Sequence, residues 1–295
     1  MKLWHLFKKK VRVLYPEVLV SLLIAFLIQC IAKNYTFVDA VKLACDSLYE
    51  MLLLSHSGLG SAKLIGPIWY LSSMILSMYI LYPLIRKYKD TMVKVVLPLV
   101  SIFALGFVTK NYNHFRTPAK WLFFVYKGFL RGMGELCLGA LLYYAAKYLK
   151  RRRFTTFGKR LLTAAKWGCW LTVIAYMSRT TIAYDAFFLA IFAIAISLSF
   201  SMQCADVRLY DCRLVYFLGK FSLPLYLNHR YYSLFFNSLV PNHMGRAHLL
   251  AIYITLAFFT AGFVMVLCAL WRKEQVRVCR KLKKLLLIQE PASRI

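Results

Sequence analysis

Residues 66–72 read Gly-Pro-Ile-Trp-Tyr-Leu-Ser, and the apolar stretch that follows them ends in Leu-Tyr-Pro-Leu-Ile-Arg at residues 81–86. An α-helix needs roughly 20 apolar residues to cross the hydrocarbon core of a bilayer, and 67–85 is of that length. Pro67 suits the first turn of a helix, where its missing N–H is not needed. The stretch therefore predicts a membrane-spanning helix.

Similar apolar segments occur on both sides of this one. Hydrophobic residues make up 61% of the chain and charged residues 17%, against roughly 45–50% and about 25% in soluble domains. The sequence predicts an all-α, polytopic membrane helix bundle with about eight transmembrane helices, placed in the cell (cytoplasmic) membrane. The other seven predicted segments are 13–32, 93–109, 129–149, 161–178, 182–202, 221–239 and 248–271.

The formal net charge of +28 comes from basic residues that gather in short clusters between the apolar segments. With the N-terminus inside, the inner stretches hold about three times as many Lys and Arg as the outer loops, as the positive-inside rule requires. Both termini are therefore predicted to be cytoplasmic. Because the basic residues do not form a polar face, nucleic acid is not expected as a partner.

Two stretches have the pattern of helices that lie on a membrane surface. Residues 38–54 place an apolar stripe against polar residues that include Glu50, and residues 274–288 mix Lys and Arg with Leu and Val. The predicted domains are a membrane domain, 1–273, and a basic amphipathic cytoplasmic tail, 274–295. The stripe in the first stretch consists of Val38, Val41, Cys45, Leu48 and Leu52.

The eight Cys show no spacing typical of a metal site, so no metal and no bound cofactor are expected. Four His lie on predicted outer loops or helix ends and are given no role, because their spacing forms neither a metal set nor a triad: His56, His114, His243 and His248.

Three stretches, in order along the chain, resemble the acyltransferase 3 family of membrane O-acyltransferases. They are the basic run 7–17 with its Arg and Pro, the opening stretch 67–85, and 218–229, which reads Leu-Gly-Lys-Phe-Ser-Leu-Pro-Leu-Tyr-Leu-Asn-His. A weaker match is Gly-Phe-Leu-Arg-Gly at 128–132 with Gly139. The resemblance implies a bacterial enzyme that transfers an acyl group, acetyl first of all, from acyl-CoA to a hydroxyl of an extracytoplasmic glycan or other surface molecule, as in polysaccharide O-acetylation.

The chain also departs from the family pattern. Members usually have about ten helices, and their basic motif follows the first two, whereas here it begins at residue 7. The family's catalytic His belongs to those first helices, and His5 does not match it. The resemblance therefore implies a chain that lacks these two helices, so an inactive chain stands as an alternative to an active acyltransferase.

Four basic residues near the N-terminus are candidates for binding the phosphates of acyl-CoA: Lys8, Lys9, Lys10 and Arg12. Cations beside phosphates form strong charge-assisted contacts. The alternative is that they anchor the helix at the inner leaflet.

Arg131 and Glu135 are four residues apart on one helical face. Charges inside a membrane segment are costly and face a bundle interior or a wet cavity, so the pair predicts either a substrate-binding pocket or a structural contact between helices. Trp69 is a candidate for stacking on a sugar ring, with anchoring at the membrane surface as the alternative.

Acyl transfer to a hydroxyl needs a general base. The catalytic residue is not fixed by the sequence; the candidates are His229 and Glu135, and His229 is also a candidate for substrate binding. The alternative function is a non-enzymatic transporter or flippase for lipid-linked sugars or anions, and a third is a membrane partner that completes its fold with another polypeptide.

Overall fold

The computed structural model describes residues 3–55, 62–112, 115, 120–178, 184–239 and 245–288. The chain is mostly helical. It divides into two compact units, each made from two stretches of sequence. Unit 1 comprises Met1–Lys8 and Asp46–Phe217, and unit 2 comprises Lys9–Cys45 and Leu218–Ile295.

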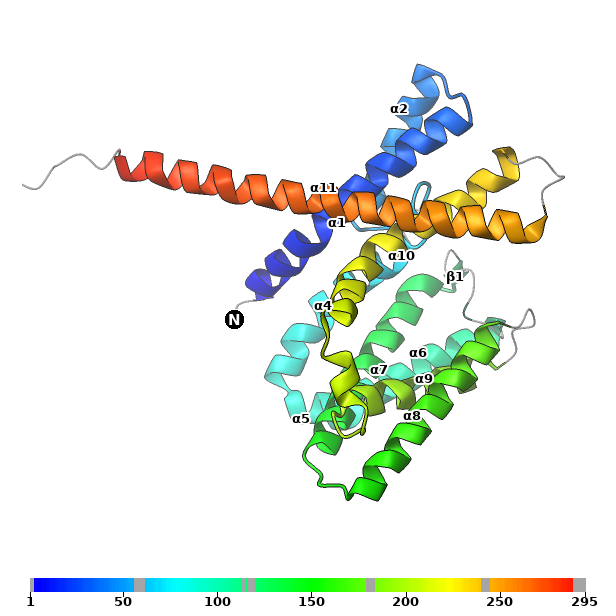
Figure 1. Cartoon of the computed structure of the whole chain (residues 1–295), viewed down its shortest axis with the longest axis vertical. Helices are drawn as coiled ribbons and strands as arrows, with labels where there is room; N and C mark the ends of the chain where they lie inside the picture. Colours follow the sequence, from blue (N-terminus) through cyan, green and yellow to red (C-terminus); the bar gives the residue numbers. More distant parts are fainter. Residues whose placement is uncertain are drawn as a thin grey trace, which may run out of the picture. The chain divides into compact units, whose positions relative to one another are not determined.

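Unit 1 is a bundle of helices (Figure 1), and a short hairpin lies between α6 and α7 in the chain. The hairpin pairs Trp121 with Tyr126 and Leu122 with Val125 in antiparallel register. Along the chain its elements are α3 (Leu48–Met51), α4 (Ile68–Lys87), α5 (Lys89–Thr91), the π-helix η1 (Met92–Val96), α6 (Leu97–Tyr112), β1 (Trp121–Leu122), β2 (Val125–Tyr126), α7 (Lys127–Lys150), α8 (Thr156–Met177), α9 (Asp185–Phe200) and the 3₁₀ helix η2 (Val207–Tyr210).

Helix α7 is the centre of unit 1, because it packs against α4, α6 and α9, while α8 packs against α9. Two apolar clusters hold these helices together. One gathers Leu81, Leu97 and Cys137, and the other gathers Leu105 and Val108 with neighbours from the hairpin. Dispersion contacts of this kind hold helices together in a bilayer, where lipid removes the hydrophobic driving force between them.

Two glycines bring α7 close to its neighbours. A Cβ on Gly132 would lie 2.0 Å from the Oγ of Ser73 on α4, and one on Gly134 would lie 3.0 Å from the Cγ of Leu105 on α6. The Ser73 hydroxyl donates a hydrogen bond of 3.2 Å to the carbonyl of Phe129, directly across this contact. Small residues at helix crossings allow such close approach in membranes.

Unit 2 contains most of α1 (Leu3–Ala32), of α2 (Phe37–Asp46) and of α10 (Arg213–Leu239), and all of α11 (Arg246–Ile288). Polar contacts join its helices: Asn228 donates to the Ser21 hydroxyl at 3.0 Å, and the Tyr231 hydroxyl donates to the Ser21 carbonyl at 2.9 Å. Arg272 forms an ion pair of 2.8 Å with Glu17. Each contact joins residues more than 200 positions apart, so the first and last helices of the chain form one unit.

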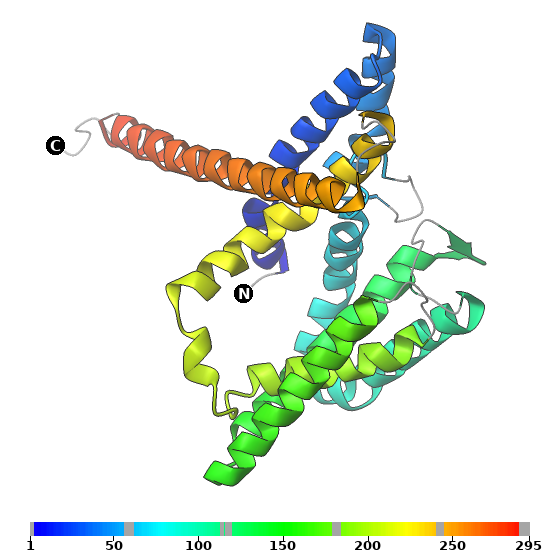
Figure 2. The same ribbon diagram turned by 45° about the vertical axis from the view of Figure 1, so that its right-hand side comes forward.

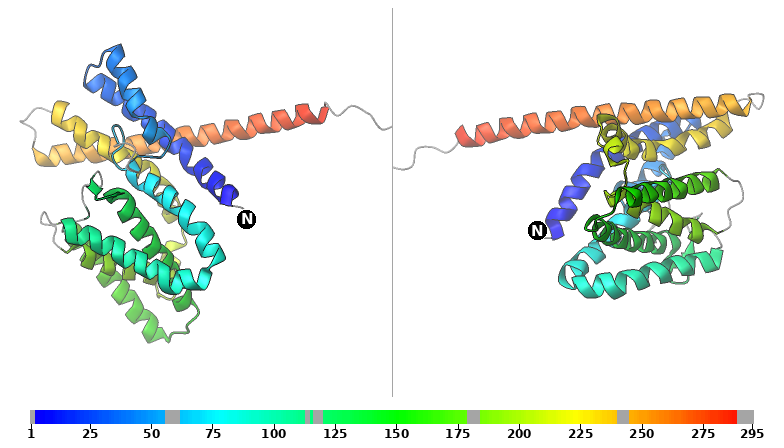
Figure 3. Two further views of the ribbon diagram at one scale, coloured as in Figure 1. Left: turned by 180° about the vertical axis from the view of Figure 1, so that it is seen from behind. Right: turned by 60° about the horizontal axis from the view of Figure 1, so that its bottom comes forward.

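Helix α11 is a single helix of 43 residues (Figures 2 and 3). The predicted tail segment 274–288 continues it rather than forming a separate helix. The division into domains at residue 273 remains a prediction. The amphipathic segment predicted at 38–54 forms α2 and α3, and its apolar stripe is exposed, with Val38 at 73% and Leu52 at 61%.

Among the residues that the structure describes, four helices are long and apolar enough to cross a membrane, by length and composition: Lys10–Ala32, Ile68–Lys87, Lys89–Asn111 and Ala247–Gln275. These helices establish an all-α membrane protein, as predicted. A shorter apolar helix spans Asp185–Phe200. The predicted segments on α7, α8 and α10 are helical too, but they contain charged residues, among them Arg131, Lys166 and Arg230.

The glycine contacts on α7 predict different effects of the same substitution at two positions. Gly132→Ala places a methyl group against Ser73 and displaces its hydrogen bond, so it should lower the free energy of unfolding by about 1–3 kcal/mol. Gly139→Ala meets nothing within 4 Å and should be neutral or stabilising by up to about 1 kcal/mol. Unfolding of the detergent-solubilised protein by SDS measures both, and equal effects would contradict the close contact of α7 with α4.

Candidate functional site

A polar cluster lies where the first turns of α4 and α7 meet the segment that follows α6. Arg131 and Glu135 form an ion pair on α7, with 2.6 Å between Nε and Oε1. The side chains are 24% and 16% exposed, so both charges are largely withdrawn from solvent. Such a pair is stable only when its remaining donors and acceptors are also satisfied.

The rest of the Arg131 guanidinium is held by two aromatic residues. Its Nη1 donates a hydrogen bond of 2.6 Å to the carbonyl of Phe115. Its central carbon lies 5.0 Å from the centre of the Trp69 ring and 5.3 Å from that of the Phe115 ring, within the range of cation–π attraction. Trp69 and the Arg131–Glu135 pair, predicted from two separate stretches as substrate-binding, are therefore in one cluster.

Two residues that the sequence analysis did not single out support this cluster. Asp185, at the start of α9, accepts hydrogen bonds of 2.7 Å from the backbone N–H of Phe115 and from the hydroxyl of Tyr176 on α8. The ring of Tyr176 stacks on Phe188, with centroids 3.5 Å apart. The only sequence signal is an acidic residue in the first turn of an apolar helix, which is favoured by the helix dipole wherever it occurs.

Glu50 has a role that differs from the prediction. The sequence places it on the polar face of a surface helix, but the structure buries it completely. Its carboxylate accepts backbone hydrogen bonds from Lys63, from Leu64 at 2.8 Å and from Ile65 at 2.7 Å. Burial raises the pKa of Glu50, and these three donors oppose that shift. Because the donors immediately precede α4, Glu50 fixes the start of the helix that bears Trp69.

His229 belongs to α10, in unit 2. It is half-buried, and its Nδ1 lies 2.8 Å from the carbonyl oxygen of Tyr226. A carbonyl oxygen only accepts hydrogen bonds, so Nδ1 carries the proton and the neutral ring has its free lone pair on Nε2. The neighbouring Arg230 is exposed.

The four basic residues predicted to bind acyl-CoA lie on the first turns of α1, which begins at Leu3 rather than near residue 13. The side chains of Lys8, Lys10 and Arg12 are exposed, and that of Lys9 lies outside the described residues. Three of the four loop histidines, His56, His114 and His243, also lie outside them. Within the described residues, no group of three His, Cys, Asp or Glu could hold a metal ion.

The apolar helices and the cluster of charges among them define a polytopic membrane protein with a polar site inside a helix bundle. Comparison with protein families specifies it further: residues 1–271 match the acyltransferase domain that defines the acyltransferase 3 family. The chain belongs to this family of membrane acyltransferases, as the three resembling stretches indicated. Searches of curated proteins and of solved structures found no match.

Removing one partner of the Arg131–Glu135 pair leaves a charge without its counterpart. Arg131→Met should lower the free energy of unfolding by about 3 kcal/mol, and the double variant Arg131→Met/Glu135→Leu should regain most of that loss. SDS unfolding of the three proteins measures both effects.

The same double variant separates the two roles considered for the pair. A substrate-binding cluster requires a stable double variant without activity, whereas a purely structural pair leaves its activity intact. If the double variant were no more stable than the single one, the ion pair would not be what holds the cluster.

Glu50→Gln replaces one acceptor oxygen by an NH₂ group that faces backbone donors. The variant should lose about 2 kcal/mol of stability, the value of hydrogen bonds to a charged group. The control is Glu274→Gln, which removes an exposed ion pair with Arg277 and should change stability by less than about 0.5 kcal/mol. Thermal unfolding in detergent compares them, and equal shifts would show that Glu50 does not hold the start of α4.

Proposed function

We propose that this chain is an integral membrane O-acyltransferase that moves an acyl group, acetyl first of all, from cytoplasmic acyl-CoA to a hydroxyl of an extracytoplasmic glycan. The family match across residues 1–271 is the observation that carries this proposal. The polar cluster on α7 supports it, because a reaction that involves a sugar and a thioester needs polar groups among apolar helices.

The proposed topology has eight membrane-crossing helices and both termini in the cytoplasm. The four helices that are both long and apolar enough to cross a membrane form half of this set, and α7, α8, α9 and α10 are the other half. Charged residues on α7 and α8 are compatible with a position inside a bundle, because Arg131 and Lys166 are paired there, the latter with Asp206 at 2.5 Å. The concentration of Lys and Arg on one side supports this orientation.

In this topology the first turns of α1 lie at the cytoplasmic surface. Lys8, Lys10 and Arg12 are exposed there, and Lys9 lies in the same run. We assign to these four residues the binding of the CoA phosphates. The acceptor glycan is assigned to the cluster of unit 1, in which Trp69 offers an aromatic face and Arg131 and Glu135 offer hydrogen-bonding groups.

His229 is a better candidate than Glu135 for the general base. One oxygen of Glu135 is already occupied by the Arg131 hydrogen bond, whereas the Nε2 of His229 has a free lone pair in the tautomer set by Tyr226. In the proposed reaction Nε2 takes the proton of the acceptor hydroxyl while its oxygen attacks the thioester carbonyl. The C–S bond then breaks, and the leaving thiolate takes up the proton.

The test measures transfer of radiolabelled acetyl from acetyl-CoA to polysaccharide in bacterial membranes that contain the full chain. Label that mild alkali releases as acetate is the expected result, because an O-acetyl ester is alkali-labile. His229→Gln keeps a donor for the Tyr226 carbonyl but removes the base, so it should lower the rate by roughly 100-fold or more with unchanged stability.

The matched control is His248→Gln, on an exposed position of α11, which should keep the full rate. A folded chain that moves a lipid-linked sugar across the membrane but forms no ester would contradict the proposal in favour of the transporter. An active His229→Gln variant would be consistent with an acyltransferase but would show that His229 is not its general base.

A further inference from the structure

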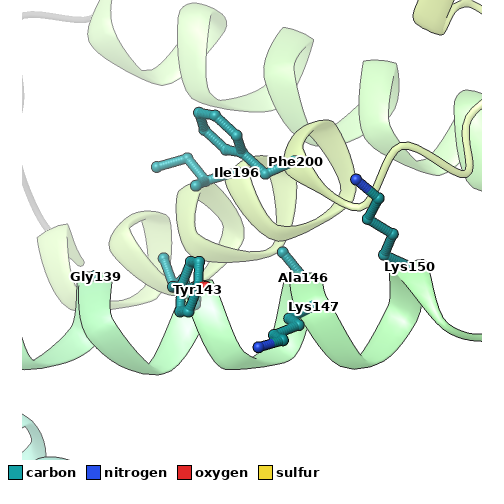
Figure 4. Close-up of a pocket in the computed structure, with 8 residues that line it drawn as sticks. Gly139, Tyr143, Ala146, Lys147, Lys150, Ile196 and Phe200 are labelled. Atoms are coloured by element: carbon teal, nitrogen blue, oxygen red, sulfur yellow. The ribbon is translucent and has the colours of Figure 1, made fainter.

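A groove of about 560 Å³ runs along α7 beside α9, away from the cluster at the start of α7 (Figure 4). Its walls come from α7 and α9, which both belong to unit 1. Most of the lining is apolar or aromatic: Gly139, Leu142, Tyr143, Ala146, Ile196 and Phe200. Such a shape accepts an extended hydrocarbon chain better than a compact polar molecule.

The groove exists because α7 has small side chains on this face. A Cβ on Gly139 would meet nothing within 4 Å, and Ala146 is buried at the floor. Tyr143 and Phe200 form the rims and are 61% and 72% exposed, so the groove opens on the surface of the bundle. In a membrane protein, an apolar groove on that surface is in contact with lipid tails.

One end of the groove is positively charged. Lys147 and Lys150 line it, one turn apart near the C-terminus of α7, and no acidic residue belongs to the lining. Among the described residues, no salt bridge involves either lysine, and Lys147 lies 6.0 Å above the Tyr143 ring. The Gln203 side chain donates a hydrogen bond of 2.9 Å to the carbonyl of Lys150. This bond joins the end of α7 to the segment after α9.

We propose that this groove binds an anionic phospholipid, with one acyl chain along the apolar walls and the phosphate against Lys147 and Lys150. A soluble anion would contact the two lysines but not the apolar walls of the groove. A lipid without a net negative charge would contact the walls but would not neutralise the two lysines. The site rests on the proposed topology, which places this end of α7 at the inner leaflet, where anionic lipids attract basic residues. It is independent of acyl transfer.

The experiment is native mass spectrometry of the full chain in detergent, titrated with phosphatidylglycerol or with phosphatidylcholine of the same acyl chains. Phosphatidylglycerol should bind roughly 25-fold more tightly, about fivefold for each of the two lysines. Removing both charges in Lys147→Gln/Lys150→Gln should abolish most of this preference, at roughly fivefold per lysine. Gly139→Leu fills the slot and should weaken the binding of both lipids while leaving the lysines in place.

Two controls match these variants. Lys87→Gln/Lys89→Gln removes two exposed charges from the end of α4 and the start of α5, and Gly168→Leu adds the same side chain at an exposed, open position of α8. None of these three residues lines the groove, so both variants should bind lipid as the parent chain does.

Equal binding of the two lipids, or loss of binding in the control variants, would overturn the proposal. So would displacement of phosphatidylglycerol by palmitoyl-CoA at a concentration well below that of the competing lipid, since the groove would then be a thioester site. A chain that transfers acetyl but binds no lipid here would refute the groove alone. A chain that binds lipid but transfers no acetyl would refute the proposed function alone.

Discussion

The cost of placing charge among apolar helices is the constraint on which the polar structure of unit 1 depends. Arg131 is held by Glu135 and two aromatic rings, and Lys166 is held by Asp206 with help from the Tyr210 hydroxyl. Each charge therefore ties its helix to another segment. Ion pairs of this kind add little net stability, but leaving one partner alone is severely destabilising, so each charge is retained together with its partner.

Much of the helix layout could be predicted from the sequence, because apolar length alone is a strong signal. Each of the eight predicted segments lies within a helix or largely overlaps one, from 13–32 in α1 to 248–271 in α11. The ends were less predictable. Helix α1 extends back to Leu3 through the basic run, since Lys and Arg are good helix formers and hydropathy marks only where a helix becomes apolar.

The site was predictable in part. Trp69, Arg131 and Glu135 could be identified one by one, because a charge or a tryptophan in a membrane segment is conspicuous. Their contact depends on how α4 and α7 cross. The packing of Gly132 against Ser73 determines this crossing, and no local sequence pattern indicates it. Glu50 was wrongly placed on a polar face because its partners are backbone groups 13 to 15 residues ahead, and backbone donors leave no trace in residue type.

Helix α7 combines these effects through its glycines. At Gly132 and Gly134, side chains of α4 and α6 occupy the space that a Cβ would need. These two glycines therefore set the distances from α7 to α4 and α6, and the contact with α4 brings Arg131 against Trp69. Gly139, one to two turns later, has no neighbour within 4 Å of a Cβ position and leaves the groove beside α9 instead. Glycine therefore allows close packing of α7 against α4 and α6 at one place and leaves space for the groove beside α9 at another. Because both lie on one rigid helix, the polar cluster and the groove are held at a fixed spacing of a few turns, without any contact between them.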